Sequence, residues 1–267
     1  MELIDKVVVV TGGASGIGRA LAGRFVAEGA RAVVVADLDQ AAASAAAADV
    51  GAALGLAVDV SSDADTQRLI ETTEARFGPV DLFCANAGIG SGLGLDAPDD
   101  VWDRMLDVNV RAHVLAARRL VPGWLARGQG YFLSTASAAG LLTQIGDAPY
   151  AVTKHAAVAF AEWLAVTYGQ RGVGVSCLCP MGVDTPLLRG GLGQEDDEGL
   201  GARVVEAAGA ILQPEEVADV VVRGLADERF LILPHPEVGE FFRRRGTDHD
   251  RWLRGMRQLQ TTVEGAR

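Results

Sequence analysis

A run of four valines leads directly into a glycine-rich turn near the start of this chain. Val7 to Val10 is an uninterrupted β-branched stretch, typical of a strand buried on both faces of a parallel sheet. The turn Thr11-Gly-Gly-Ala-Ser-Gly-Ile-Gly18 follows, and then an amphipathic helix is expected from about Ile17 to Glu28. This order brings backbone N–H groups to a helix N-terminus, where a pyrophosphate can bind. A tight turn without a ligand is the alternative.

The second expected strand, Ala32 to Ala36, ends at an acidic residue, Asp37. A carboxylate at this place accepts hydrogen bonds from an adenosine ribose and repels a 2′-phosphate. Its neighbour is Leu38, and the glycine-rich turn holds no Lys or Arg that would pair with a phosphate. The sequence therefore favours NAD over NADP as cofactor. The alternative is that Asp37 merely caps the helix that begins near Asp39.

Further short apolar runs complete the expected sheet. They are Leu56 to Val58, Val80 to Ala85, Tyr131 to Ser134, Val173 to Cys179 and Phe230 to Leu233. With helices between them, they predict an α/β protein with a Rossmann-like, doubly wound parallel sheet of about seven strands and helices on both faces. Neither a repeat nor a linker interrupts the chain, so we expect one domain over residues 1–267. Residues 187–212 read as irregular, either a lid or a surface loop.

Tyr150 and Lys154 are four residues apart, so on a helix they share one face. A phenol titrates near pH ~10, and an ammonium about 4–6 Å away lowers that pKa by roughly 1–3. Such a pair can exchange a proton with an alcohol or carbonyl oxygen, and Ser137 offers a hydroxyl to hold the same oxygen. Lys154 is one of two lysines against 22 arginines, which indicates a role for a compact ammonium. The alternative is a half-buried Tyr under a solvated Lys.

Asn109 places an amide in an apolar helical stretch, where it must be fully hydrogen-bonded. It either supports a backbone irregularity or holds a water molecule. The net charge of −11 argues against nucleic-acid binding. No signal peptide or membrane-spanning stretch is expected, which favours a cytoplasmic protein without a membrane partner. The three cysteines lie in apolar runs and are expected to be buried thiols, not a disulfide framework or a metal site.

Together the motifs resemble the short-chain dehydrogenase/reductase family over nearly the whole chain. The turn Thr11-Gly-x-x-x-Gly16-x-Gly18 is similar to its cofactor turn, and Asn109, Ser137, Tyr150 and Lys154 match its four catalytic positions in order and spacing. The resemblance implies that Ser137 orients the substrate oxygen, Tyr150 is the acid/base, Lys154 binds the nicotinamide ribose and lowers the Tyr150 pKa, and Asn109 holds a water. The cofactor contacts that follow are Gly12, Ala14, Ser15, Gly16, Ile17, Gly18, Asp37, Leu38, Asp59, Val60, Asn86, Ala87, Gly88, Tyr150, Lys154, Pro180, Val183 and Thr185.

Two positions depart from the family pattern. Ala85 stands where many members have a second Asn, and Met181 stands where a Gly is usual, beside the expected nicotinamide site. The implied activity is NAD-dependent interconversion of a secondary alcohol and a ketone. An idle NAD-binding regulator or scaffold and an NADPH-dependent reductase are the alternatives.

The substrate is expected to be a small hydrophobic alcohol or ketone. The candidate pocket residues are Leu93, Leu95, Leu141, Leu142, Ile145, Met181, Leu187 and Leu188. Gln144 and Arg189 are polar candidates that would modify this apolar character. The family resemblance also implies a homotetramer or homodimer. The C-terminal extension, about residues 235–267, is basic and amphipathic, and we expect it to pack at the active-site rim or at a subunit interface.

Overall fold

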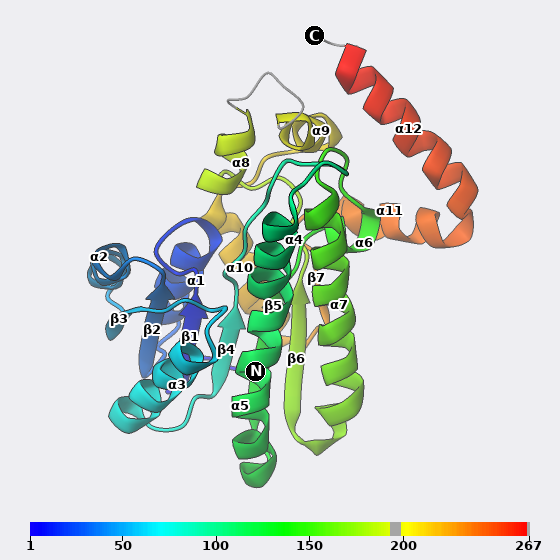
Figure 1. Cartoon of the computed structure of the whole chain (residues 1–267). Coiled ribbons are helices and arrows are strands. Elements are labelled where there is room, and N and C mark those ends of the chain that lie inside the picture. The colour runs from blue at the N-terminus through cyan, green and yellow to red at the C-terminus, as the bar shows by residue number, and fades with distance from the viewer. Residues whose placement is uncertain (193–198, 266–267) are drawn as a thin grey trace.

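The computed structural model describes residues 1–192 and 199–265 of the 267-residue chain. Its centre is a seven-stranded, all-parallel sheet in the order β3-β2-β1-β4-β5-β6-β7 (Figure 1). The strands are β1 (Val7–Thr11), β2 (Ala32–Asp37), β3 (Leu54–Ala57), β4 (Leu82–Ala85), β5 (Gly130–Thr135), β6 (Val173–Leu178) and β7 (Leu231–Ile232). The predicted doubly wound α/β fold is confirmed.

Alternation along β1 divides the core between the two faces of the sheet. Val8 and Val10 point to the layer formed by α1 (Gly16–Ala27), α2 (Gln40–Val50) and α10 (Pro214–Ala226). Val9 points to the opposite layer, formed by α3 (Asp63–Phe77), α5 (Ala112–Arg127) and α7 (Ala148–Tyr168). All three side chains are fully buried, as a run of β-branched residues in a central parallel strand requires.

The third strand differs from its prediction, because it begins at Leu54 and ends before Val58. Gly55 hid the start of this strand from the sequence pattern, since glycine weakens a strand signal. The structure gives the reason for the glycine: a Cβ there would lie 2.4 Å from the Ala43 carbonyl oxygen of α2. The strand therefore depends on close packing of helix on sheet.

The prediction that residues 187–212 are irregular is wrong for the part that the structure describes. Two helices occupy it, α8 (Pro186–Leu192) and α9 (Leu200–Ala208). The acidic run from Glu195 to Glu198 lies outside the described residues. A lid function for this segment stays a prediction.

The C-terminal extension forms two helices, α11 (Pro236–Thr247) and α12 (His249–Gly265). Figure 1 shows them beside α6 (Ala139–Leu142) and α9, with α12 running away from the sheet. The remaining helical elements are α4 (Asp99–Leu106), a π-helical stretch (Asp107–Arg111) and a 3-10 turn (Gly169–Arg171). Within residues 1–192 and 199–265, no helix combines the length and apolar character that a membrane crossing needs.

Candidate active site

A cavity of about 680 Å³ opens at the carboxyl edge of the sheet. Its wall includes residues at or just after the ends of five strands: Gly12, Asp37, Asn86, Ser137 and Pro180. The strand order reverses between β1 and β4, and open α/β sheets bind ligands at such a point. The predicted cofactor contacts in this wall are Gly12, Ser15, Gly16, Ile17, Gly18, Asp37, Leu38, Asp59, Val60, Asn86, Ala87, Gly88, Tyr150, Lys154, Pro180, Val183 and Thr185.

The glycine-rich turn has a shape that side chains would block. Gly12 and Gly16 have φ values of 62° and 49°, in the left-handed region that favours glycine. A Cβ on Gly18 would lie 2.1 Å from the Gly12 carbonyl oxygen. Ser15 precedes α1 without a side-chain cap, so no side-chain cap occupies the first-turn N–H groups of α1, and Gly16, Ile17 and Gly18 of this turn line the cavity. The turn fits a pyrophosphate at a helix N-terminus.

Asp37 ends β2 and connects it to the glycine-rich turn. Its Oδ2 accepts from the backbone N–H of Ala14 at 2.9 Å, and its Oδ1 accepts from the backbone N–H of Leu38 at 2.8 Å. Ala14 does not line the cavity, and its backbone N–H binds Asp37, while its contact with the cofactor stays a prediction. The alternative that Asp37 caps the next helix is wrong, because Asp39 caps α2 by accepting from the N–H of Ala42.

Hydrogen bonds accepted by Thr11 and donated by Ser61 hold two further parts of the cavity wall. The Thr11 hydroxyl accepts from the backbone N–H groups of Asn86 and Ala87, at 3.0 and 3.2 Å, which joins the ends of β1 and β4. Burial raises the pKa of Asp59, but hydrogen bonds from Ser61 and the charge of Arg104 outweigh it and keep that pKa below its ordinary value. Asp59 is therefore an anionic acceptor at this rim.

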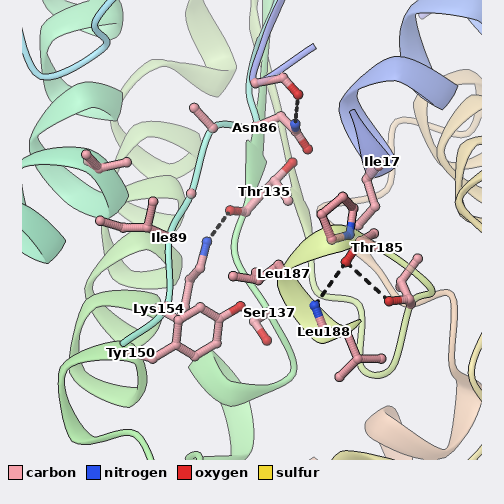
Figure 2. A pocket seen from close by; sticks show the side chains of 18 of the residues that line it. Ile17, Asn86, Ile89, Thr135, Ser137, Tyr150, Lys154, Thr185, Leu187 and Leu188 are labelled. Carbon is pink, nitrogen blue, oxygen red and sulfur yellow. Dashed lines mark hydrogen bonds between the residues drawn. The ribbon is translucent and has the colours of Figure 1, made fainter. Parts of the chain in front are cut away.

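Ser137, Tyr150 and Lys154 meet on one side of the cavity. Figure 2 shows the Tyr150 hydroxyl directed toward Ser137, while Lys154 reaches back to the end of β5. The Lys154 Nζ donates to the Thr135 carbonyl oxygen at 3.1 Å and lies 5.5 Å from the centre of the Tyr150 ring. Lys154 is 3% exposed, and burial lowers its pKa to about 8. The predicted shared face of Tyr150 and Lys154 is present in α7.

The expected lowering of the Tyr150 pKa is wrong for this structure. Burial raises the pKa of the phenol above its ordinary value, and the interaction with the Ser137 hydroxyl opposes that rise without cancelling it. The spacing of Tyr150 and Lys154 predicted the position of the ammonium, whereas the cost of burying the phenolate depends on the packed structure.

Asn109 lies in the π-helical stretch Asp107–Arg111 and does not line the cavity, but a Cβ on the wall residue Gly88 would lie 3.3 Å from its Oδ1. Its Oδ1 accepts from the N–H of Ile89, and its Nδ2 donates to the Ile89 carbonyl oxygen, both at 2.9 Å. Nδ2 also donates to the Thr153 hydroxyl at 3.1 Å. This buried amide thus sits at a backbone irregularity and joins the loop after β4 to α7, while its predicted water stays a prediction.

Two buried residues that sequence reasoning missed support the site. Asp147 caps α7, and an acid directly before Ala-Pro was a readable helix-start signal. His235, 2% exposed, accepts at Nδ1 from the backbone N–H of Met181 and donates from Nε2 to the carbonyl oxygens of Gly182 and Ala210. These hydrogen bonds fix the turn that carries Met181. Met181 does not have a positive φ, so a side chain at this position, where glycine is usual, causes no backbone strain from a left-handed conformation.

A second, largely apolar cavity of about 980 Å³ adjoins the first. The two share Ser137, Gln144, Met181 and Val205. Its far wall comes from the C-terminal extension, through Phe241, Trp252, Met256 and Leu259.

The predicted pocket residues divide between these two cavities. Leu142, Gln144, Ile145 and Met181 line the second cavity, and Leu187 and Leu188 line the first. Leu95 is 99% exposed, so its predicted place in the pocket is wrong. Leu93, Leu141 and Arg189 also lie outside both walls.

The chain is similar to known proteins over most of its length. Residues 6–195 match the family model described as short chain dehydrogenase. The chain is 35% identical over 246 residues to 1-deoxy-11-beta-hydroxypentalenate dehydrogenase of Streptomyces exfoliatus, which covers 89% of this chain and 86% of that protein.

Two solved structures are also similar to this chain over most of its length. A short chain dehydrogenase/reductase from Burkholderia phymatum in complex with NAD superposes with a TM-score of 0.84 at 31% identity, covering 94% of this chain and 96% of that chain. A 3-ketoacyl-(acyl-carrier-protein) reductase from Brucella melitensis complexed with NADH gives a TM-score of 0.75 at 30% identity, covering 86% of this chain and 96% of that chain. The chain belongs to the short-chain dehydrogenase/reductase family of oxidoreductases.

Proposed function

We propose that this protein is an NAD-dependent dehydrogenase that interconverts a hydrophobic secondary alcohol and its ketone. One observation carries the proposal. Ser137, Tyr150 and Lys154 line the same cavity as the glycine-rich turn and Asp37. Acid/base groups and a dinucleotide cradle in one cavity are what hydride transfer to or from a carbon bearing a hydroxyl requires.

Each catalytic residue has a distinct part in the proposed reaction. The Ser137 hydroxyl holds the substrate oxygen, and the Tyr150 phenol takes its proton during oxidation and returns it during reduction. The Lys154 ammonium lies close enough to stabilise the phenolate and to bind a ribose hydroxyl. Bound nicotinamide supplies the hydride acceptor or donor. Gly12, Gly18 and their neighbours fit this cofactor, because their missing side chains leave room for its phosphates.

The choice of NAD rests on Asp37. Its two oxygens accept one backbone N–H each, so free lone pairs remain for the two ribose hydroxyls. A 2′-phosphate at the same place would meet this carboxylate, with the exposed Leu38 beside it in place of a cation. The Burkholderia phymatum relative holds NAD, which is consistent with this choice.

The second cavity supports an apolar substrate. The reacting carbon would lie by Ser137, where the two cavities join, and the apolar body would extend toward Trp252 and Met256. The name of the Streptomyces exfoliatus relative describes the dehydrogenation of a hydroxylated pentalenate, which agrees with a hydroxyl-bearing substrate.

We also propose a homodimer or homotetramer. Trp163 and Val166 on α7 are 53% and 84% exposed, and apolar side chains of this size favour burial against a second copy. Sedimentation velocity measures the assembly, and a monomer at micromolar concentration would contradict it. A cytoplasmic location remains a prediction from the sequence.

The test is reduced-nicotinamide absorbance with 2-propanol, cyclohexanol and 1-phenylethanol, each with NAD and with NADP. We expect NAD-dependent oxidation that is fastest with the larger apolar alcohols. Tyr150→Phe should reduce turnover by about 10²–10⁴-fold while NADH still binds, as measured by its fluorescence. Near-normal turnover by this variant would contradict the mechanism, and binding of NADH without oxidation of any alcohol would favour an idle regulator.

A further inference from the structure

Asp147 lies directly before α7, three residues ahead of Tyr150, and is 7% exposed. Its Oδ1 accepts from the backbone N–H of Tyr150 at 2.9 Å and from the Ser91 hydroxyl at 2.8 Å. Its Oδ2 accepts from the backbone N–H groups of Ser91 and Gly92, each at 2.7 Å. One buried carboxylate therefore caps the helix that carries Tyr150 and also holds the loop that follows β4.

Both sides of this connection border the first cavity, whose wall includes Gly90, Asp147 and Tyr150. The loop backbone lies close to both side chains: a Cβ on Gly90 would lie 3.5 Å from Oδ2 of Asp147 and 3.8 Å from Cδ2 of Tyr150. The N–H of Ala148 also donates to the Leu93 carbonyl oxygen at 2.9 Å. The loop 90–93 is thus held against the first turn of α7.

Helix capping accounts for part of this arrangement. A cap needs one acceptor for an N–H of the first turn, and Ser, Thr or Asn also supplies it. Asp39, the exposed cap of α2, accepts from the N–H of Ala42 in this way. Three of the four hydrogen bonds to Asp147 come from the loop instead.

We propose that Asp147 is a positioning residue, which holds the loop 90–93 at a fixed place relative to the Tyr150 hydroxyl and so sets where the substrate lies. This inference rests on the proposed function, because it concerns the same cavity. Reaction rates depend steeply on such geometry, and a displacement of about 1 Å can cost on the order of 10²-fold.

Asp147→Ser separates the two roles. A serine hydroxyl is a good cap for the N–H of Tyr150, but it cannot supply the acceptors for Ser91 and Gly92. Asp39→Ser is the matched control, since it makes the same change at an exposed cap whose side chain binds the N–H of Ala42 in α2 and neither the loop 90–93 nor α7. Amide hydrogen exchange of the loop reports the connection without turnover. The values of kcat and KM with 1-phenylethanol and NAD report its effect on catalysis.

In Asp147→Ser we expect the amides of Ser91 and Gly92 to exchange at least about tenfold faster. We expect kcat/KM to fall by roughly 10- to 100-fold, mainly through kcat, while the dissociation constant of NADH stays within about threefold. Ser91→Ala should lower kcat/KM about threefold in the unmodified chain. In Asp147→Ser it should lower kcat/KM no further, because the effects of coupled residues are not additive. Asp39→Ser should change none of these values.

The proposal is overturned by slow exchange at Ser91 and Gly92 in Asp147→Ser, or by kcat/KM within about twofold of the unmodified chain. An equal loss in Asp39→Ser would also overturn it, because the effect would then be general destabilisation. If the unmodified chain oxidised no alcohol, the proposed function would fail instead, and the exchange comparison would still decide whether Asp147 holds the loop.

Discussion

Replacing Lys154 with Met should stabilise the ligand-free protein near neutral pH while it abolishes turnover. Lys154 is 3% exposed, and burial lowers its pKa from 10.5 to about 8. The folded state therefore binds this proton more weakly than the unfolded state does. A pKa difference of about 2.5 corresponds to about 3 kcal/mol of unfolding free energy, at about 1.4 kcal/mol for each pKa unit.

The sign follows from the order of the two pKa values. Below pH 8 the lysine is charged in both states, and the folded protein carries the full cost of burying the charge. Between pH 8 and 10.5 the unfolded chain binds more protons, so the stability of the unmodified protein rises with pH. Methionine removes this cost but loses the hydrogen bond to the Thr135 carbonyl oxygen, worth about 1 kcal/mol. We expect a net gain of about 2 kcal/mol at pH 7 that is lost near pH 10.

Urea unfolding of both proteins at pH 7 and pH 10, followed by tryptophan fluorescence, measures this difference. Lys6→Met is the matched control, since it removes the other lysine, which lies directly before β1. It should change the free energy of unfolding by less than about 0.5 kcal/mol at either pH. A Lys154→Met protein that is less stable at pH 7, or equally changed at both pH values, would refute the reasoning.

Three further changes test other parts of the molecule. We expect the unmodified enzyme to prefer NAD over NADP by about a hundredfold in kcat/KM, and the double variant Asp37→Ala, Leu38→Arg should shrink or invert this preference. Equal kcat/KM with both cofactors in the unmodified enzyme would contradict the role of Asp37. Thr143 has a φ of 89°, which is strained for a β-branched residue, so Thr143→Gly should raise the free energy of unfolding by about 1 kcal/mol, and a loss of stability would count against this. Trp252→Ala should raise KM for 1-phenylethanol about tenfold but leave KM for 2-propanol nearly unchanged, because Trp252 lines the second cavity. Leu253, 40% exposed on the same helix, is the control, and Leu253→Ala should change neither KM. Equal effects of the two variants would show that the second cavity does not hold the substrate.

The amino-acid sequence determined the fold and most of the candidate site. An uninterrupted β-branched run such as Val7 to Val10 places apolar side chains on both faces of a strand, so both faces must be buried. Such a run therefore indicated a parallel sheet covered on both sides. The glycine-rich turn was readable because a backbone that must approach phosphates excludes side chains. Tyr150 and Lys154 were readable because their spacing on one helix fixes their relation without tertiary information.

The tertiary structure decided what depends on segments far apart in the chain. Asp147 could be read as a helix cap, but its hydrogen bonds to Ser91 and Gly92 join residues more than fifty positions away. The second cavity exists because the C-terminal extension packs near α9. The amphipathic pattern of the extension predicted packing at the active-site rim or at a subunit interface, but it did not specify which helix the extension meets. The raised pKa of Tyr150 likewise comes from burial. A motif shows which charges are neighbours, whereas the cost of removing them from water depends on everything packed around them.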